Sequence, residues 1–327
     1  MILMCVGDDV IVLSLASPDR LLRRNPMKRL LLLIAALGLV LAGCGGSSST
    51  AATVEGTDVT VDNVNGLFYE IDGEFTDEQF AGYLSTLIQW KAIEQRAEDE
   101  LGFTATEEEI GAEVDSILLE SGYEGDLDTF LSEQNVSEEG LGQYAKQLLI
   151  EDAVSDALIG SVEMPTIEDA QAEIDASPLE YTQVCASHIL VGSEEEAQAV
   201  VTRLDAGEDF TVVAAEVSTD TGSGANGGSL GCTSPARYVP EFAEATMTAP
   251  IGEVTEPIES EFGFHVILVE DRTEATAEEV QSIMGDRALF DAVDQWLLDS
   301  IVNADVTVVA QYGTWQVDPS PQVVPPS

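Results

Sequence analysis

The segments Ala186-Ser187-His188-Ile189-Leu190-Val191 and Phe262-Gly263-Phe264-His265-Val266-Ile267 contain the only two histidines of this 327-residue chain. Each segment is a run of apolar and β-branched residues, which is the composition of a buried strand. A histidine that faces inward from a strand is usually a hydrogen-bonded core residue. Either segment taken alone therefore predicts a strand but indicates no function.

Between the two histidine segments lies an ordered series of short motifs. They are a helical stretch over 197–204, Gly207-Glu208-Asp209-Phe210, Ser218-Thr219-Asp220, Gly227-Gly228-Ser229-Leu230-Gly231, Tyr238-Val239-Pro240-Glu241-Phe242 and Gly252-Glu253-Val254. Over residues 179–272 this series resembles, segment by segment and in order, the rotamase domain of the parvulin family. Each motif is weak by itself, but the set in register is specific. The resemblance implies an α+β domain with the order βαααβαββ, whose antiparallel sheet carries two facing histidines at its centre.

The resemblance also implies roles for individual residues. His188 and His265 would be the central histidine pair, Asp220 would lie beside the bound peptide bond, and Ser260 would hydrogen-bond the pair. The apolar pocket that holds a proline ring would be formed by Leu230, Tyr238, Phe242 and Met247. The sequence departs from the family pattern mildly, with Ser229 in place of Asp, Tyr238 in place of Met and Phe264 in place of Tyr.

The activity implied by this resemblance is peptidyl-prolyl cis/trans isomerisation. Amide resonance opposes rotation about a peptide bond with a barrier of about 18–20 kcal/mol, and X-Pro exchange takes tens of seconds or more without a catalyst. A dry apolar pocket with well-placed polar groups can lower that barrier without a nucleophile or a cofactor. We therefore expect no cofactor, and we expect the histidines to act as positioning and electrostatic groups without transferring protons.

The loop after the first histidine segment bears on the choice of substrate. Parvulins that require a phosphorylated substrate carry a basic loop at this place, whereas the sequence here is Gly192-Ser193-Glu194-Glu195-Glu196. Three carboxylates repel a phosphate group. Phosphate-dependent recognition is therefore not expected.

Charge excludes further classes of partner. The chain has 12 Lys and Arg against 61 Asp and Glu, a formal net charge of −49. So strong a negative field repels nucleic acids and anionic lipid headgroups, and neither is an expected partner. Dispersed carboxylates with few lysines are typical of adaptation to salt, but selection for solubility alone would produce the same composition.

The N-terminal region has the pattern of a secretory signal. Basic residues at Met27-Lys28-Arg29 precede an apolar run from Leu30 to Leu41, which is too short to cross a bilayer. The run ends in Leu41-Ala42-Gly43-Cys44, which resembles the lipobox of bacterial lipoproteins. The alternative is an ordinary cleaved signal with a chance cysteine. We interpret residues 1–43 as leader and signal peptide, with Met27 as the true start, and 44–52 as a flexible tether. A lipid on Cys44 would be the protein's contact with the membrane, on its extracytoplasmic side.

Four cysteines remain to be assigned. Cys5 falls in the leader and Cys44 in the lipobox, which leaves Cys185 and Cys232 as an even pair in an oxidising compartment. The parvulin resemblance places these two on neighbouring strands and so implies a disulfide, although two buried free thiols remain the alternative. A zinc site from two cysteines and two histidines is not expected, since no C-x-x-C spacing occurs.

The flanks of the rotamase region are mostly helical. Apolar residues at helical spacing predict helices over 77–101, from Thr106 onward, over 128–134, 138–159 and 277–301, with short strands at 52–54, 59–64 and 306–309. Residues 53–178 and 273–315 resemble the N-terminal region of the SurA/PrsA class of extracytoplasmic foldases. The rotamase domain would then be inserted into a discontinuous, mostly helical chaperone module. The Pro-rich segment 316–327 is predicted to be disordered.

Two functions follow from these patterns. The first is an extracytoplasmic prolyl isomerase that assists the folding of secreted or membrane-associated polypeptides with X-Pro bonds. The alternative is a holdase chaperone that keeps the parvulin fold only as a peptide-binding platform. The intact set of His188, Asp220 and His265 favours the enzyme. The sequence identifies neither the client proteins nor the oligomeric state.

Overall fold

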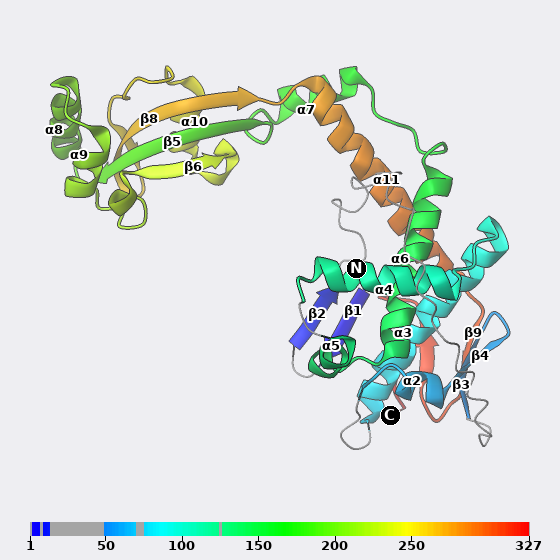
Figure 1. Ribbon diagram of the computed structural model, residues 1–327. Helices are drawn as coiled ribbons and strands as arrows, with labels where there is room; N and C mark the ends of the chain where they lie inside the picture. Colours follow the sequence, from blue (N-terminus) through cyan, green and yellow to red (C-terminus); the bar gives the residue numbers. More distant parts are fainter. Residues whose placement is uncertain (1, 7–8, 14–48, 70–74, 124–125, 327) are drawn as a thin grey trace. The chain divides into compact units, whose positions relative to one another are not determined.

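The computed structural model describes residues 2–6, 9–13, 49–69, 75–123, 126–326. It divides into two compact units, one formed by Met1–Glu163 with Asp286–Ser327 and the other by Met164–Gly285 (Figure 1). The predicted fold class, an α+β domain inserted into a mostly helical module, is confirmed. Cys44 and the apolar run before it lie outside the described residues. At the N-terminus, β1 (Ile2–Val6) pairs antiparallel with β2 (Asp9–Leu13).

The first unit contains a small antiparallel sheet in the order β4-β3-β9. Its strands are β3 (Thr50–Val54), β4 (Thr57–Thr60) and β9 (Val306–Val308). The tether predicted over 44–52 ends earlier than expected, because Ala51 and Ala52 are fully buried in β3. The strand predicted over 59–64 is also wrong in its second half. Thr60 forms a capping box with Asn63 and thereby starts the short helix α2 (Val61–Asn65).

Local sequence explains where the main helices begin. α3 (Asp77–Arg96) and α4 (Glu107–Glu120) each start at a threonine whose hydroxyl accepts the N–H of a residue three positions on, and that residue's side chain bonds back to the threonine N–H. Asp126 caps α5 (Leu127–Gln134), and Ser137 caps α6 (Glu138–Leu158). After α3 the chain continues as one π-helical turn, Ala97–Leu101, which ends at Gly102 in the left-handed conformation.

Helix α11 (Ala277–Val302) returns the chain to the first unit. Its apolar residues Val293, Trp296 and Leu297 form a buried cluster with residues of α3 and α6. Arg96 of α3 donates to the carbonyl oxygen of Trp296 at 3.0 Å, and its guanidinium lies over the indole ring. Residues near both ends of the chain therefore share one core, as expected for a discontinuous module.

The C-terminal segment predicted to be disordered is ordered in the structure. β10 (Thr314–Gln316) pairs antiparallel with β11 (Gln322–Val324). Val323 is only 4% exposed and belongs to the apolar core that also contains Leu84 and Ile88 of α3. The prolines that suggested disorder flank this strand and leave its pairing residues free, which is the reason that the prediction was wrong.

The second unit is built on a four-stranded antiparallel sheet in the order β6-β5-β8-β7. Its strands are β5 (Thr182–Val191), β6 (Ser229–Thr233), β7 (Ile258–Ser260) and β8 (Gly263–Glu274). The two histidine segments form parts of β5 and β8, which are neighbours at the centre of the sheet. Figure 1 shows the long β5 and β8 ribbons side by side.

Helices cover both faces of this sheet. α8 (Glu194–Asp205) and α9 (Phe210–Val217) pack on one face, where Ile189 of β5 and Val266 of β8 are fully buried. α10 (Pro240–Thr248) packs on the other face against Ala186 and Ile267. Because strand side chains alternate between faces, the even-numbered residues of this part of β5 and the odd-numbered residues of β8 face α10. His188 and His265 share that face.

The second unit extends beyond the residues predicted for the rotamase domain, 179–272, at both ends. α7 (Ile167–Ala176) belongs to it, as do the first turns of α11. The side-chain amide of Gln281 donates to the carbonyl oxygen of Pro165 at 2.9 Å, and the Tyr181 hydroxyl donates to Glu173. These contacts fix the two segments that connect the second unit to the rest of the chain, one before β5 and one after β8.

Cys185 and Cys232 form a disulfide in the structure. They lie directly opposite each other in the β5–β6 register, with Cα atoms 3.9 Å apart, and the bond closes a loop of 47 residues. β6 is a short strand at the edge of the sheet. The disulfide and a few main-chain hydrogen bonds attach it to β5. The disulfide therefore holds the edge of the sheet.

We predict that replacing both cysteines by serine lowers the free energy of unfolding by about 2–4 kcal/mol, because the open loop gains chain entropy in the unfolded state. Denaturant titration of the oxidised protein and of the double variant measures the difference. Non-reduced peptide mass spectrometry of the exported protein should show the crosslinked pair. Free thiols at both positions, open to alkylation without reductant, would contradict this.

Candidate functional site

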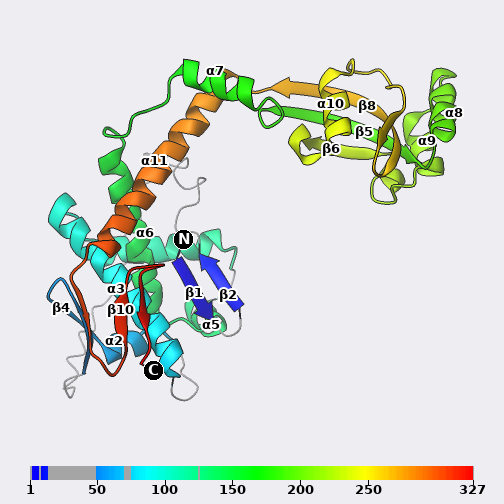
Figure 2. The same cartoon turned by 180° about the vertical axis from the view of Figure 1, so that it is seen from behind.

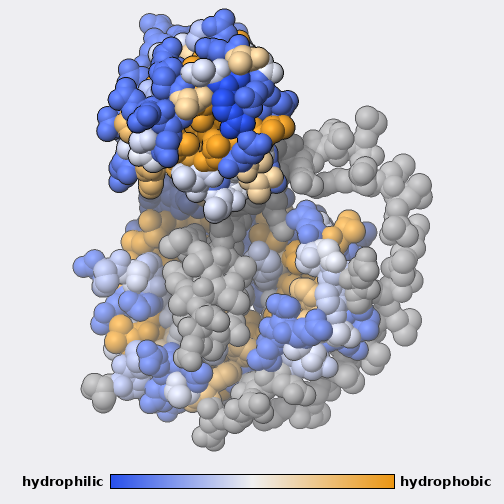
Figure 3. Space-filling model, turned by 90° about the vertical axis from the view of Figure 1, so that its left-hand side faces the viewer, coloured by the Kyte–Doolittle hydropathy of each residue, from blue (hydrophilic) through white to orange (hydrophobic). Residues whose placement is uncertain are grey.

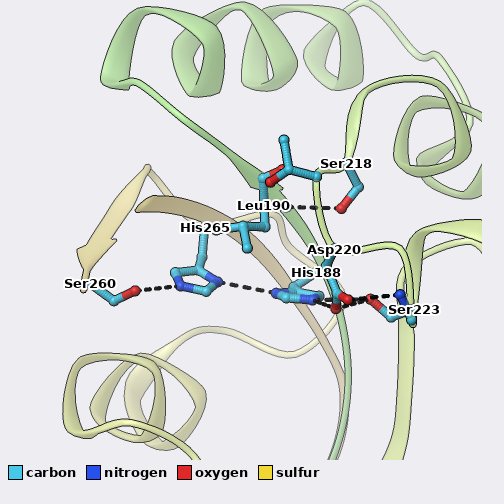
Figure 4. A network of polar contacts seen from close by, with 9 residues as sticks. His188, Leu190, Ser218, Asp220, Ser223, Ser260 and His265 are labelled. Atoms are coloured by element: carbon cyan, nitrogen blue, oxygen red, sulfur yellow. Dashed lines mark hydrogen bonds and ion pairs between the residues drawn. The ribbon is translucent and has the colours of Figure 1, made fainter. Parts of the chain in front are cut away.

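The histidine pair occupies the centre of the sheet in the second unit. His188 and His265 are 6% and 4% exposed, and their Nδ1 atoms lie 3.1 Å apart (Figure 4). The rings are stacked with centroids 5.4 Å apart. The strand register places His188 opposite Ile267 and His265 opposite Leu190, so that the two rings are diagonal neighbours on one face.

The outer nitrogen of His188 binds an acidic loop. Its Nε2 lies 2.8 Å from Oδ2 of Asp220 and 3.1 Å from Oγ of Ser223. Ser223 donates to the same carboxylate oxygen at 2.6 Å, and the N–H of Gly222 donates to the other at 2.9 Å. These hydrogen bonds, with that from Ser223 the strongest and that from His188 next, hold the pKa of Asp220 far below its usual range. Asp220 is therefore a carboxylate at neutral pH.

The loop that carries Asp220 is fixed to β5 by main-chain contacts. The N–H of Thr219 donates to the carbonyl oxygen of Leu190 at 2.7 Å, and Oγ of Ser218 accepts the N–H of Leu190 at 3.2 Å. Gly228 then approaches β5 so closely that a Cβ atom there would collide with the carbonyl oxygen of His188. Its φ of +83° is also suited to glycine. These contacts explain the glycine pair before β6.

The outer nitrogen of His265 binds a hydroxyl. Oγ of Ser260 lies 2.7 Å from Nε2 of His265, at the end of β7 where the chain turns into β8. The same Oγ accepts the N–H of Phe262 at 3.1 Å. The hydroxyl thus joins the imidazole to the main chain. Ser260 therefore orients the ring of His265.

Each ring nitrogen of the histidine pair has a hydrogen-bond partner. A carboxylate only accepts hydrogen bonds, so Nε2 of His188 must donate to Asp220. The two Nδ1 atoms share the inner hydrogen bond, and Nε2 of His265 bonds to Ser260. Burial, followed by the proximity of His188, lowers the pKa of His265 to about 4, which keeps its ring neutral at pH 7. An unbroken chain of hydrogen bonds thus joins Ser260 to Asp220 through both imidazoles.

An aromatic side chain of α10 covers the histidine pair. The ring of Phe242 is 3% exposed and lies edge-on to both imidazoles, with centroid distances of 5.6 Å to His188 and 5.3 Å to His265. Tyr238 lies beside it at 4.7 Å, and Leu230 packs against the same cluster. Met247 is half-buried on α10 and does not belong to this cluster. Three of the four predicted pocket residues are therefore brought together.

Two positioning residues were not found from the sequence. Ser223 shares Asp220 with His188, and Arg272 of β8 donates to the carbonyl oxygens of Thr246 and Ala249 at the C-terminal end of α10. A cation at a helix C-terminus stabilises the unpaired carbonyl groups. Arg272 thereby anchors the helix that carries Phe242. The Ser-x-Asp-x-x-Ser spacing could have indicated Ser223, but nothing local in the sequence indicates Arg272.

Hydrophilic residues cover most of the face of the second unit that is turned to the viewer in Figure 3, around a small apolar patch. Within the described ranges, no group of three or more His, Cys, Asp or Glu side chains could hold a metal ion. No helix in the described part of the chain is long and apolar enough to cross a membrane.

The fold and the paired histidines define a class of protein, the peptidyl-prolyl isomerases, and a family comparison agrees. Residues 177–273 match the family model of the PPIC-type PPIASE domain. "Foldase protein PrsA" of Halalkalibacterium halodurans is 32% identical over 301 residues, which cover 86% of each chain. The PrsA of Oceanobacillus iheyensis is 30% identical over 272 residues, 81% of this chain and 84% of that protein. This chain belongs to the PrsA foldase family.

A solved structure of a PrsA protein is also similar to this chain. A crystal structure of PrsA from Bacillus cereus is 23% identical and covers 82% of this chain and 96% of that one, with a TM-score of 0.35.

We predict that His265 stays neutral down to a pH of about 4, whereas the unfolded chain takes up a proton near 6.5. Its signals in a histidine-labelled NMR titration should therefore change with a midpoint near the lower value. Since only the unfolded state binds the proton between these values, His265 makes the fold less stable as the pH falls through that window. Ser260→Ala, which removes the partner of His265 alone, identifies the ring. Titration of the His265 ring near 6.5 would contradict the lowered pKa.

Proposed function

We propose that the chain is a parvulin-type prolyl isomerase, anchored by a lipid outside the cytoplasm, whose reaction takes place on the histidine face beside Asp220. The observation that carries this proposal is the uninterrupted hydrogen-bond chain from Ser260 through both histidines to Asp220, next to the apolar wall of Phe242. Membership of the PrsA foldase family supports unfolded secreted polypeptides as the substrates.

The apolar wall would hold the proline ring while the preceding residue turns. Phe242, Tyr238 and Leu230 present a surface without a charge, which suits a pyrrolidine ring. Arg272 of β8 ties down the end of α10 and so helps to hold Phe242 in place. A fixed proline and a freely turning partner are the geometry that a rotation needs. Met247, the fourth residue predicted for this pocket, lies outside the cluster and is not needed for this role.

Asp220 would weaken the bond that has to rotate. The partial double bond of an amide depends on electron density that moves from nitrogen onto the carbonyl oxygen. A fixed negative charge beside that oxygen opposes this movement and favours the twisted amide. The buried histidines hold Asp220 in place and keep it ionised, since His188 and Ser223 both donate to it. No bond is made or broken to a protein atom in this scheme.

The substrate would be unphosphorylated. The loop that precedes α8 begins at Gly192, and α8 opens with Glu194, Glu195 and Glu196, of which all three are exposed. These carboxylates repel a phosphate group that approaches this loop. Asp220 itself adds a further negative charge. No observation on the described residues favours the holdase alternative.

We predict that Asp220→Asn lowers kcat/KM for a short X-Pro peptide by at least about tenfold, because it removes a preorganised charge but keeps the shape of the side chain. A protease-coupled or NMR exchange assay measures the rate. The matched control is Asp205→Asn, the same change at an exposed position at the end of α8. An unchanged rate in Asp220→Asn would reject the role of the carboxylate, whereas a wild-type protein that does not accelerate the exchange at all would leave the holdase alternative.

We predict that Cys44→Ala releases the protein from the membrane fraction and removes the mass of a diacylglyceryl group, since the lipobox Leu41-Ala42-Gly43-Cys44 is then broken. Fractionation of cells and intact-mass measurement test this. The Cys5→Ala variant is the control, because Cys5 lies in the predicted leader. Wild-type protein that is entirely soluble, with an unmodified Cys44, would reject the anchor.

A further inference from the structure

Strand β11 lies on a surface formed by α3 and β10, here called the seat. The seat has the features of a binding site for an extended polypeptide. β11 lies beside α3 and β10 in the first unit (Figure 2). Its N–H at Val323 donates to Oγ of Ser85 at 2.8 Å, and its carbonyl oxygen at Pro321 accepts from the side-chain amide of Gln89 at 2.9 Å. Ser85 and Gln89 are one helical turn apart on α3, and both contact main-chain atoms of this segment, while the Ser85 hydroxyl itself donates to the carbonyl oxygen of Ala81.

The other edge of the strand is also bound through its main chain. The register pairs Gln316 with Gln322 and Thr314 with Val324. In an extended strand, the polar groups of alternate residues point to opposite edges. Since the groups of Pro321 and Val323 face α3, those of Gln322 and Val324 face β10. The strand is therefore bound on both edges by contacts that do not depend on which side chains it carries.

A single side chain of the strand is buried. Val323 is 4% exposed and packs in the core cluster around Leu84 and Ile88, whereas Gln322 is exposed and Val324 is half-buried. Glycine at position 313 is required for the close approach, because a Cβ there would collide with the carbonyl oxygen of Val324. The seat thus offers the main-chain edge of β10, two polar side chains of α3 and one apolar pocket, which suits recognition by strand addition.

We propose that this seat binds uncharged, extended segments of unfolded substrate polypeptides, and that the chain's own residues 317–326 occupy it in the resting state. An unfolded chain supplies main-chain groups at every residue and a β-branched or other apolar side chain at many of them. The tail residues 319–326, Pro-Ser-Pro-Gln-Val-Val-Pro-Pro, carry no charge and satisfy the same requirements. The docked tail, here called the strap, would block the seat until an extended segment of a substrate polypeptide displaces it. This inference rests on the foldase function.

The energetic consequence is a lower apparent affinity in the resting state. When a binding-competent state is only partly populated, the apparent affinity falls by that fraction. A tail that is docked nine-tenths or more of the time weakens client binding about tenfold or more. Docking of the tail also covers the edge of β10, which would otherwise be an open template for strand pairing.

The first test releases the strap in the full-length protein. Val323→Asp places a carboxylate in an apolar pocket and should eject the tail. Binding of reduced, S-alkylated ribonuclease A, a permanently unfolded probe, should then tighten about tenfold. The matched control is Gln322→Asp, which adds the same charge at an exposed neighbour and should leave binding as in the wild type. A synthetic peptide of residues 317–326 should compete with the probe in the released variant.

The second test does not depend on how well a destabilised variant folds. Gln316→Cys with Gln322→Cys allows a disulfide across β10 and β11 that locks the tail in its seat. The oxidised, locked protein should bind the unfolded probe at least about tenfold more weakly than the wild type. Binding equal to that of the wild type in the locked form, or no competition by the tail peptide, would overturn the proposal. Isomerisation of a short X-Pro peptide, measured in every variant, reports separately on the proposed activity of the second unit.

Discussion

The antiparallel pairing of β5 with β8 is the constraint on which the rest of the second unit depends. It joins Thr182–Val191 to Gly263–Glu274, and it brings together two histidines that are 77 residues apart in the chain. A shift of one residue in this register would turn one ring to the opposite face of the sheet. The core residues Ile189 and Val266 on the α8–α9 face oppose such a shift, because they would lose their burial. Hydrophobic packing on one face thus fixes polar geometry on the other.

The same pairing explains why buried polar groups are tolerated at the centre of the sheet. Both imidazoles have a partner for each ring nitrogen, and the chain ends at one hydroxyl and one carboxylate near the surface. A buried polar group costs little free energy when its hydrogen bonds are satisfied. Tyr238 differs, since its buried hydroxyl has no partner among the described residues, and burial raises its pKa. The aromatic wall therefore contains one unsatisfied donor, at a position where the sequence departs from the usual methionine.

The sequence predicts those features of the molecule that are determined by residues close together in the chain. Strand β5, the capping boxes at Thr76 and Thr106 and the helix starts near them follow from neighbouring residues, and the sequence is sufficient to predict them. The contacts of Arg272 with the end of α10, and of the tail with Ser85, join residues that are far apart and carry no motif. The prolines around Val323 resembled a disordered segment because nothing beside them shows the apolar pocket on α3.

The inserted position of the second unit has a consequence for how the protein acquires its structure. Every element of that unit lies between Met164 and Gly285, so it can fold as soon as this stretch has crossed the membrane. The first unit cannot complete its fold at that stage. Its strand β3 (Thr50–Val54) pairs with β9 (Val306–Val308), which crosses the membrane later. A chain exported from its N-terminus therefore has a finished catalytic unit before it has a finished chaperone module. During the biogenesis of this foldase, the three-stranded sheet of its first unit therefore stays incomplete until the end of the chain has been translocated.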